Sequence, residues 1–150
     1  MPSAAVDDPV DTRPAYLSAL ETIVADIVAP RAIEVDRDSV FPREALGAMG
    51  EAGLLGLVSA PDVGGLGEGF RAAACVVGEL AGHCASTAMV VMMHYAASAV
   101  IEAHGPLEVR QAIAAGDYGG GAVLGLLWLA VGYALLSQHD VSVLLRTRRK

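Results

Sequence analysis

The sequence predicts an all-α fold of five or six helices, and three observations support this prediction. Apolar residues recur every three or four positions through most of residues 14–118, which is the helical period. Glycine and proline interrupt the pattern at intervals, as at Pro30, Gly53 and Gly105-Pro106. Strand-like alternation of apolar and polar residues is almost absent. With 150 residues, the chain is long enough for one domain with a hydrophobic core.

The first helix is expected to start near Asp11 or Thr12, either of which can cap it, with Pro14 in its first turn. Pro30 is expected to end or kink this helix, because proline lacks a backbone N–H. We expect the charged residues 34–39 to form mostly a connection. The predicted apolar face consists of Leu17, Leu20, Val24, Ile27 and Val28.

The second helix is expected to open at Pro42 and to stop at Gly53. Its predicted apolar side comprises Ala45, Leu46 and Met49. A short apolar run at 54–58 then leads into residues 61–67, which are rich in turn formers.

Three further helices are expected in the second half of the chain. The first of them covers 69–81, the next runs from an N-cap at Ser86 to about His104, and the last covers 106–115 and is closed by Gly116. Residues 88–101 are apolar nearly all the way round, which predicts a helix buried on every side.

Charge is distributed unevenly along this chain of net charge −7. Residues 1–118 carry 16 of the 17 acidic and six of the ten basic side chains, a net charge of −10, whereas 119–150 carry +3. This balance argues against a nucleic-acid-binding face. Hydrophobic residues make up 54% of the chain, above the roughly 45–50% of typical soluble domains. Part of the surface is therefore expected to need a partner.

The termini and cysteines indicate a reducing compartment. Cys75 and Cys84 lie in apolar helical sequence and form no disulfide framework. The acidic residues 1–13 lack the features of a secretion signal and are expected to be disordered. We therefore expect a cytoplasmic protein.

Two groups of residues resemble sites but favour structural roles. Cys75, His83, Cys84 and His94 are potential zinc ligands, but their spacings fit no familiar zinc pattern, so no metal site is predicted. The glycine-rich residues 64–69 are not preceded by a strand and Phe70 replaces the last glycine of a dinucleotide motif. A turn between helices is the favoured interpretation.

Five segments in order carry a family resemblance: FPREALGAMGEAGLLGL, the GGLG loop, VVGELAGHCASTAM, MHYAASAVIEAHG and VRQAIAAG. This series resembles the N-terminal helical domain of the acyl-CoA dehydrogenases over residues 16–118. The resemblance implies FAD-dependent α,β-dehydrogenation of acyl-CoA thioesters, in which a glutamate removes the α proton and the flavin accepts hydride from the β carbon. It also implies acyl-CoA as the substrate partner.

The resemblance assigns this chain part of the wall of a substrate pocket, but no catalytic residue. The glutamate base belongs to a C-terminal helical bundle that we expect to lie outside these 150 residues, so no catalytic or cofactor-binding residue is predicted, and the chain alone is not expected to bind FAD or to turn over substrate. In the family, the fourth helix lines part of the acyl-chain pocket. Core packing is the default interpretation of methionines in such a helix. By resemblance, the substrate-pocket wall comprises Met89, Met92, Met93, His94 and Tyr95.

The resemblance stops at Gly119, where the family continues into a β-barrel. Residues 119–136 are uncharged and precede a basic cluster at 146–150. Three origins compete: a frameshifted or truncated gene, which we favour, a genuine alternative C-terminus, or a fused membrane anchor. The segment reaches the lower length limit of a transmembrane helix, but its five glycines weaken that interpretation, and we favour a helix packed on the domain or an aggregating tail.

These features lead to two competing functions. We favour a truncated acyl-CoA dehydrogenase-like protein that self-associates through exposed apolar surface. The alternative is a helical interaction or membrane-anchoring module, with 119–136 as the membrane-associated segment.

Overall fold

The computed structural model describes residues 14–117, and the regular elements of this part of the chain are all helices, as predicted. A π-helical turn (η1, Val24–Val28) and two 3₁₀ turns (η2, Leu54–Gly56, and η3, Pro61–Val63) accompany the α-helices. The α-helices are α1 (Ala15–Ile23), α2 (Ala29–Asp38), α3 (Arg43–Glu51), α4 (Phe70–Ala81), α5 (Ala85–His104) and α6 (Leu107–Ala114).

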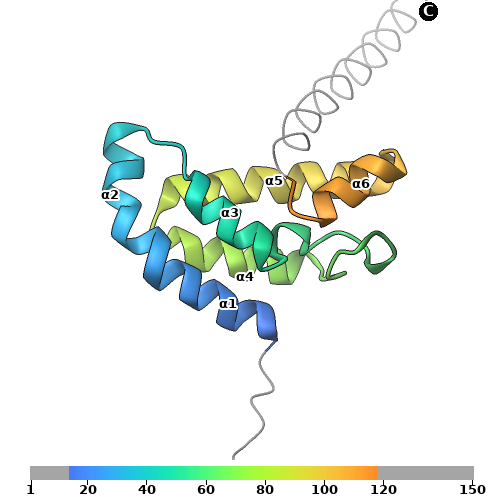
Figure 1. Cartoon of the computed structure of the whole chain (residues 1–150), viewed down its shortest axis with the longest axis horizontal. Coiled ribbons are helices and arrows are strands. Elements are labelled where there is room, and N and C mark those ends of the chain that lie inside the picture. Colours follow the sequence, from blue (N-terminus) through green and yellow to red (C-terminus); the bar gives the residue numbers. More distant parts are fainter. Residues whose placement is uncertain (1–13, 118–150) are drawn as a thin grey trace, which may run out of the picture.

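The helices form two layers around one core (Figure 1). α4 and α5 pack side by side as one layer, and α1, α2 and α3 lie across them as the other. α6 runs back alongside the C-terminal part of α5. The side chains between the layers are almost fully buried and include Leu20, Leu46, Met49, Leu54, Leu55, Leu57, Val76, Leu80 and Val91.

The helix that carries Pro30 is longer than predicted. α1, η1 and α2 follow one another without a break from Ala15 to Asp38, so the expectation that residues 34–39 form a connection is wrong. In the π turn, the Ala29 N–H bonds to the Val24 carbonyl five residues earlier. Pro30 follows in the first turn of α2, a position where a missing N–H is tolerated. The helix ends at Ser39, whose φ of 54° is left-handed.

The helix predicted after Pro42 is confirmed. Pro42 is the N-cap of α3, and Ala45, Leu46 and Met49 are its buried residues. The chain turns at Gly53, whose φ of 73° suits glycine.

Of the predicted N-caps, one is wrong and the other lies outside the described residues. α5 begins at Ala85 after Cys84, so the predicted cap at Ser86 is wrong. Asp11 and Thr12 lie outside the described residues, and the residue directly before α1 is Pro14. No side-chain cap hydrogen bond forms at either helix, so the usual chemical signal of a helix start is missing.

The described chain leaves the domain through a close backbone contact. After α6, Gly116 adopts a φ of 87°, and a Cβ atom there would lie 2.9 Å from the Cα atom of Gly50. Only glycine fits at this position.

Within residues 14–117, none of the helices has the length and apolarity needed to cross a membrane. The predicted disordered segment 1–13 and the predicted apolar helix over 119–136 both fall outside the described residues.

Candidate functional site

Helix α5 carries all five residues of the predicted substrate wall, and the structure divides them between two sides. Met89, Met92 and Met93 are 53%, 46% and 47% exposed, whereas His94 and Tyr95 are buried. The prediction that residues 88–101 are buried on every side is therefore wrong. α5 packs against α4, α6, α2 and η2, and these neighbours do not surround it.

The exposed side of α5 forms a continuous apolar strip. Because successive residues of an α-helix are 100° apart, Met89, Met92, Met93, Ala96 and Ala103 fall on one side, and all five are exposed. We call these five residues the methionine stripe. From Ala85 to Ile101 the helix contains no acidic or basic side chain apart from the buried His94.

The buried side of α5 forms hydrogen bonds to the 3₁₀ turn η2. The His94 ring Nε2 lies 2.8 Å from the Leu55 carbonyl oxygen, and the Tyr95 hydroxyl donates to the Leu54 carbonyl oxygen at 2.8 Å. The Ser98 hydroxyl donates to the His94 carbonyl one turn earlier. The bonds from His94 and Tyr95 tie the buried side of α5 to the main chain of η2.

Burial shifts the pKa of both aromatic side chains away from acid–base use. Desolvation lowers the pKa of His94, although its hydrogen bond to Leu55 opposes the shift. Desolvation also raises the pKa of Tyr95. Both side chains are therefore held neutral and suit a structural role.

A partly buried ion pair fastens the end of α5 to the loop that follows η2. The Glu102 carboxylate accepts hydrogen bonds from Arg110 of α6 and from the Ala60 N–H at 3.2 Å. Arg110 also lies 3.6 Å from the Asp62 carboxylate. The hydrogen bond from Arg110 is the main reason why the pKa of Glu102 is lowered.

The cluster around Glu102 and Arg110 was not predicted from the sequence. Its only signal was a pair of opposite charges eight residues apart on either side of Gly105-Pro106, where the helix turns back.

The methionine stripe leads into a hollow of about 300 Å³ at the start of α4. Ala99 and Ala103 of α5 form one wall, and Phe70, which is 70% exposed, forms another. Val58, Glu68, Gly69 and Glu102 complete the lining.

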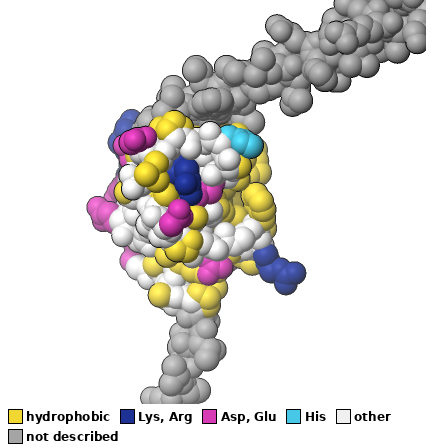
Figure 2. All heavy atoms as spheres, turned by 90° about the vertical axis from the view of Figure 1, so that its right-hand side faces the viewer, with side chains coloured by type: hydrophobic (Ala, Val, Ile, Leu, Met, Phe, Trp, Pro, Cys, Tyr) yellow, Lys and Arg dark blue, Asp and Glu magenta, His cyan; other side chains and the backbone are white. Residues whose placement is uncertain are grey.

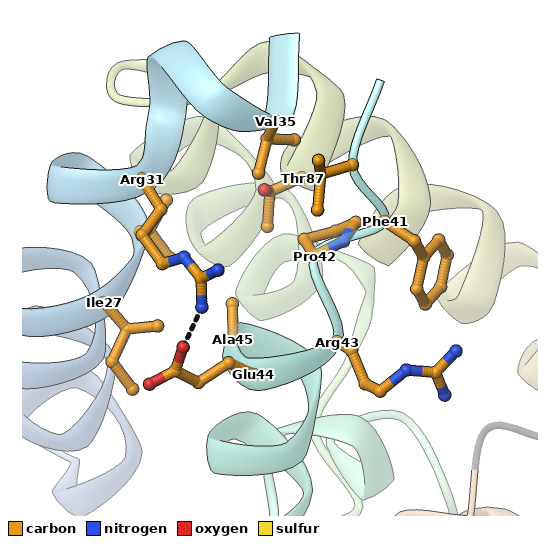
Figure 3. Close-up of a pocket in the computed structure, with 11 residues that line it drawn as sticks. Ile27, Arg31, Val35, Phe41, Pro42, Arg43, Glu44, Ala45 and Thr87 are labelled. Atoms are coloured by element: carbon orange, nitrogen blue, oxygen red, sulfur yellow. Dashed lines mark hydrogen bonds and ion pairs between the residues drawn. The ribbon is translucent and has the colours of Figure 1, made fainter. Parts of the chain in front are cut away.

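A second pocket, of about 410 Å³, lies between α2, α3 and the start of α5 (Figure 3). Arg31 and Glu44 point toward each other across it and form an ion pair, and Arg31 also pairs with Glu34. Arg43 extends away from them and lies over the Phe41 ring at 5.7 Å. Apolar side chains make up most of the remaining lining, so this pocket brings together no nucleophile and base.

The glycine-rich loop uses its backbone donors internally. The N–H groups of Leu66, Gly67 and Glu68 donate to the carbonyls of Gly56, Ser59 and Leu57 at 3.0, 2.8 and 2.9 Å. These donors are therefore not free to cradle a phosphate, which supports the interpretation of this loop as a turn.

The potential metal ligands are dispersed in the structure. Cys75 is exposed, Cys84 is buried, and both are free thiols. His83, in the turn after α4, lies 3.6 Å from the carboxylate of Glu79 on that helix. Across residues 14–117, no three His, Cys, Asp or Glu side chains are close enough to hold a metal ion together.

The fold and the site define a helical domain in which the polar side chains described above bond to other parts of the domain. Its longest helix, α5, has an uncharged apolar side that is exposed. The sequence matches the family model described as "Acyl-CoA dehydrogenase, N-terminal domain" over residues 11–116, and the chain belongs to this family. The resemblance stated from the sequence is thereby confirmed.

Comparison with individual proteins gives a more distant relative. Over 82 residues the chain is 33% identical to an acryloyl-CoA reductase (NADH) from Anaerotignum propionicum, a match that covers 55% of this chain and 21% of that protein. The aligned region is thus about a fifth of the relative's length. No solved structure matches the chain.

Proposed function

We propose that this chain is the helical part of an FAD-dependent acyl-CoA oxidoreductase and supplies a substrate-facing surface. The observation that carries the proposal is the exposure of Met89, Met92 and Met93 on an uncharged side of α5 in a domain of this family. Methionine is flexible and polarisable, so such side chains can adapt to an acyl chain. Their role is apolar contact and exclusion of water.

The flavin belongs to the family chemistry, in which it accepts hydride from the substrate, but the glycine-rich loop of this chain does not fit it. Binding a dinucleotide requires donors for its pyrophosphate. The glycine-loop N–H groups are occupied, and Arg31 and Arg110 are engaged by carboxylates. We therefore expect this chain alone to bind no FAD and to catalyse no turnover.

His94 and Tyr95 have an indirect role in this proposal. Both bond to η2 from the buried side of α5, and this fixes how the helix is rotated. In this proposal His94 and Tyr95 position the three methionines. Only Met89, Met92 and Met93 would contact the acyl chain.

A domain exchange tests the proposal. Residues 11–116 replace the matching segment of the acryloyl-CoA reductase from Anaerotignum propionicum, and flavin content is measured before NADH-dependent reduction of acryloyl-CoA. We expect a flavin-loaded, active chimera. In it, Met92→Ala with Met93→Ala should shift preference toward longer acyl thioesters, because shortening both side chains leaves more room.

Ile33→Ala is the matched control, because Ile33 is a 71% exposed apolar residue on α2. A flavin-loaded chimera without turnover would contradict the enzyme assignment. An active chimera whose chain-length preference ignores the methionine substitutions would contradict the substrate wall.

A further inference from the structure

The pocket of about 410 Å³ between α2, α3 and the start of α5 has no part in the acyl-wall assignment. Its volume lies within the range of roughly 300–1,000 Å³ that is usual for sites of small organic ligands. Of the described α5 residues, only Thr87 lines this pocket. The pocket is therefore separate from the methionine stripe.

An irregular helical turn builds one wall of this pocket. Ile27 and Val28 belong to the π turn η1, and they line the pocket together with Val35 of α2. Val40 and Pro42 extend the same apolar lining toward α3. Single π-helical turns are rare and occur frequently at functional sites. The wall thus suits the apolar body of a ligand.

Arg43 supplies a positive charge at the rim of the pocket. Figure 3 shows its side chain extending away from Arg31 and Glu44, which pair with each other. Within residues 14–117, Arg43 forms no ion pair, and its guanidinium lies over the Phe41 ring at 5.7 Å. A guanidinium without a carboxylate partner suits contact with a carboxylate, because its N–H groups match the two oxygens.

The opposite end of the domain offers a different surface. Figure 2 faces the end where α5 finishes and α6 begins, and acidic side chains are spread over it. An anionic ligand is disfavoured on such a surface. The pocket between α2 and α3 instead combines an apolar wall with an unpaired cation.

We propose that this pocket binds a small organic monocarboxylate, with its apolar body against η1 and α2 and its carboxylate beside Arg43. Contact with the aliphatic side chains of the wall removes the body of the ligand from water, which supplies the hydrophobic stabilisation. The Thr87 hydroxyl on the buried side already donates to the Cys84 sulfur at 3.2 Å. The carboxylate is therefore expected at the rim.

The proposal does not depend on the proposed enzyme function, since it uses neither a flavin nor the methionine stripe. Its test contains no CoA compound. Failure of the test would therefore leave the acyl-wall assignment untouched.

Hexanoate is the probe that tests this site. Hexanol and hexylamine are the matched probes, because they have the same apolar body with a neutral or a positive head. Each probe is titrated into the full 150-residue protein at pH 7, and the methyl NMR signals of Ile27 and Val28 are followed. We expect saturable shifts of both residues with hexanoate, and weaker binding of the other two probes.

Arg43→Gln should weaken hexanoate binding roughly two- to fivefold, as expected for an exposed charge pair. The same variant should leave hexanol binding unchanged, because only the carboxylate contacts Arg43. Arg43 is exposed, so the helical circular dichroism should remain. Arg71→Gln is the matched control and should change neither affinity, since Arg71 is an exposed arginine on α4 that does not line the pocket.

Equal affinity for the three probes would overturn the preference for a carboxylate. Equal weakening by Arg43→Gln and Arg71→Gln would show that only net charge matters and would overturn the site. Hexanoate that shifted the methyl signals of the methionine stripe in place of those of Ile27 and Val28 would overturn the location. A wild-type protein whose signals show no saturable change with hexanoate would overturn the proposal outright.

Discussion

The two sides of α5 use similar apolar residues for different purposes. The inner side buries Val91, His94 and Tyr95 and bonds to the carbonyls of η2. The outer side presents Met89, Met92 and Met93 without such bonds in the described structure. Hydropathy alone does not distinguish the two sides, whereas the few polar atoms on the inner side do. The inner side is therefore expected to control stability, and the outer side to control contacts.

The largest effect is expected where η2 meets α6. In Gly56→Ala, the new Cβ atom would lie 2.5 Å from the Ala114 carbonyl oxygen. Relieving that overlap should reduce the free energy of unfolding by about 3 kcal/mol, measured by urea denaturation. Gly47→Ala is the control, because nothing lies within 4 Å of its Cβ position in α3. A gain of about 0.5–1 kcal/mol is expected there, and equal losses in both variants would refute the close contact.

Removal of the Glu102 charge should have the next largest effect. Glu102→Gln weakens the bonds from Arg110 and from the Ala60 N–H, and should cost about 1.5–3 kcal/mol of unfolding free energy at pH 7.

The effect of Glu102 should also depend on pH. Because the folded-state pKa of Glu102 is lowered, its stabilisation is present above the unfolded value of about 4.3 and disappears as pH falls through the folded pKa. Wild type and Glu102→Gln should therefore converge in acid. Glu108→Gln, in the exposed first turn of α6, is the control and should change little. A difference that persisted at every pH would contradict the ion pair.

A smaller effect is expected from His94. Since burial lowers its folded-state pKa, the unfolded chain takes up the proton first as pH falls. Unfolding free energy should therefore be undiminished by this group above about pH 6.5 and decline below it. His94→Gln keeps an N–H donor for Leu55 but does not titrate, so this decline should be absent from thermal unfolding curves. An identical pH profile in both proteins would show that His94 is not responsible.

The smallest effect is expected on the outer side. Met92→Ala removes a half-exposed side chain and should change unfolding free energy by no more than about 0.5 kcal/mol. Its neighbour Val91 is fully buried, and Val91→Ala should cost about 2 kcal/mol. Comparable losses in the two variants would mean that the outer side is as well packed as the inner side.

Local chemistry predicted some elements of this fold closely. Pro42 and Gly53 bound the region of α3 as expected, because a fixed φ and a left-handed turn are properties of single residues. The prediction for residues 34–38 was wrong because Pro30 alone indicates an end or a kink, whereas the π turn just before it lets the helix continue through α2.

The sequence predicted that the candidate site lies on one helix, but not which of its residues are buried and which are exposed. Residues 89–95 were correctly placed on one long helix, yet all five wall candidates are uncharged at neutral pH and look alike to an apolar pattern. Which of them face inward depends on the carbonyls of Leu54 and Leu55, about 40 positions earlier in the chain. The bond between Glu102 and Arg110 likewise requires the turn at Gly105-Pro106 to bring them together.

The contact between Gly116 and Gly50 fixes where the described chain ends relative to α3. The main chain at Gly116 lies close against the main chain of α3 at Gly50. This approach is possible because neither residue has a Cβ atom. A Cβ atom at Gly116 would overlap the Gly50 main chain at 2.9 Å, whereas one at Gly50 would lie 3.3 Å from the Gly116 carbonyl oxygen and require a smaller shift. The pair thus holds the end of the described chain against α3, and a side chain at Gly116 would loosen that end first.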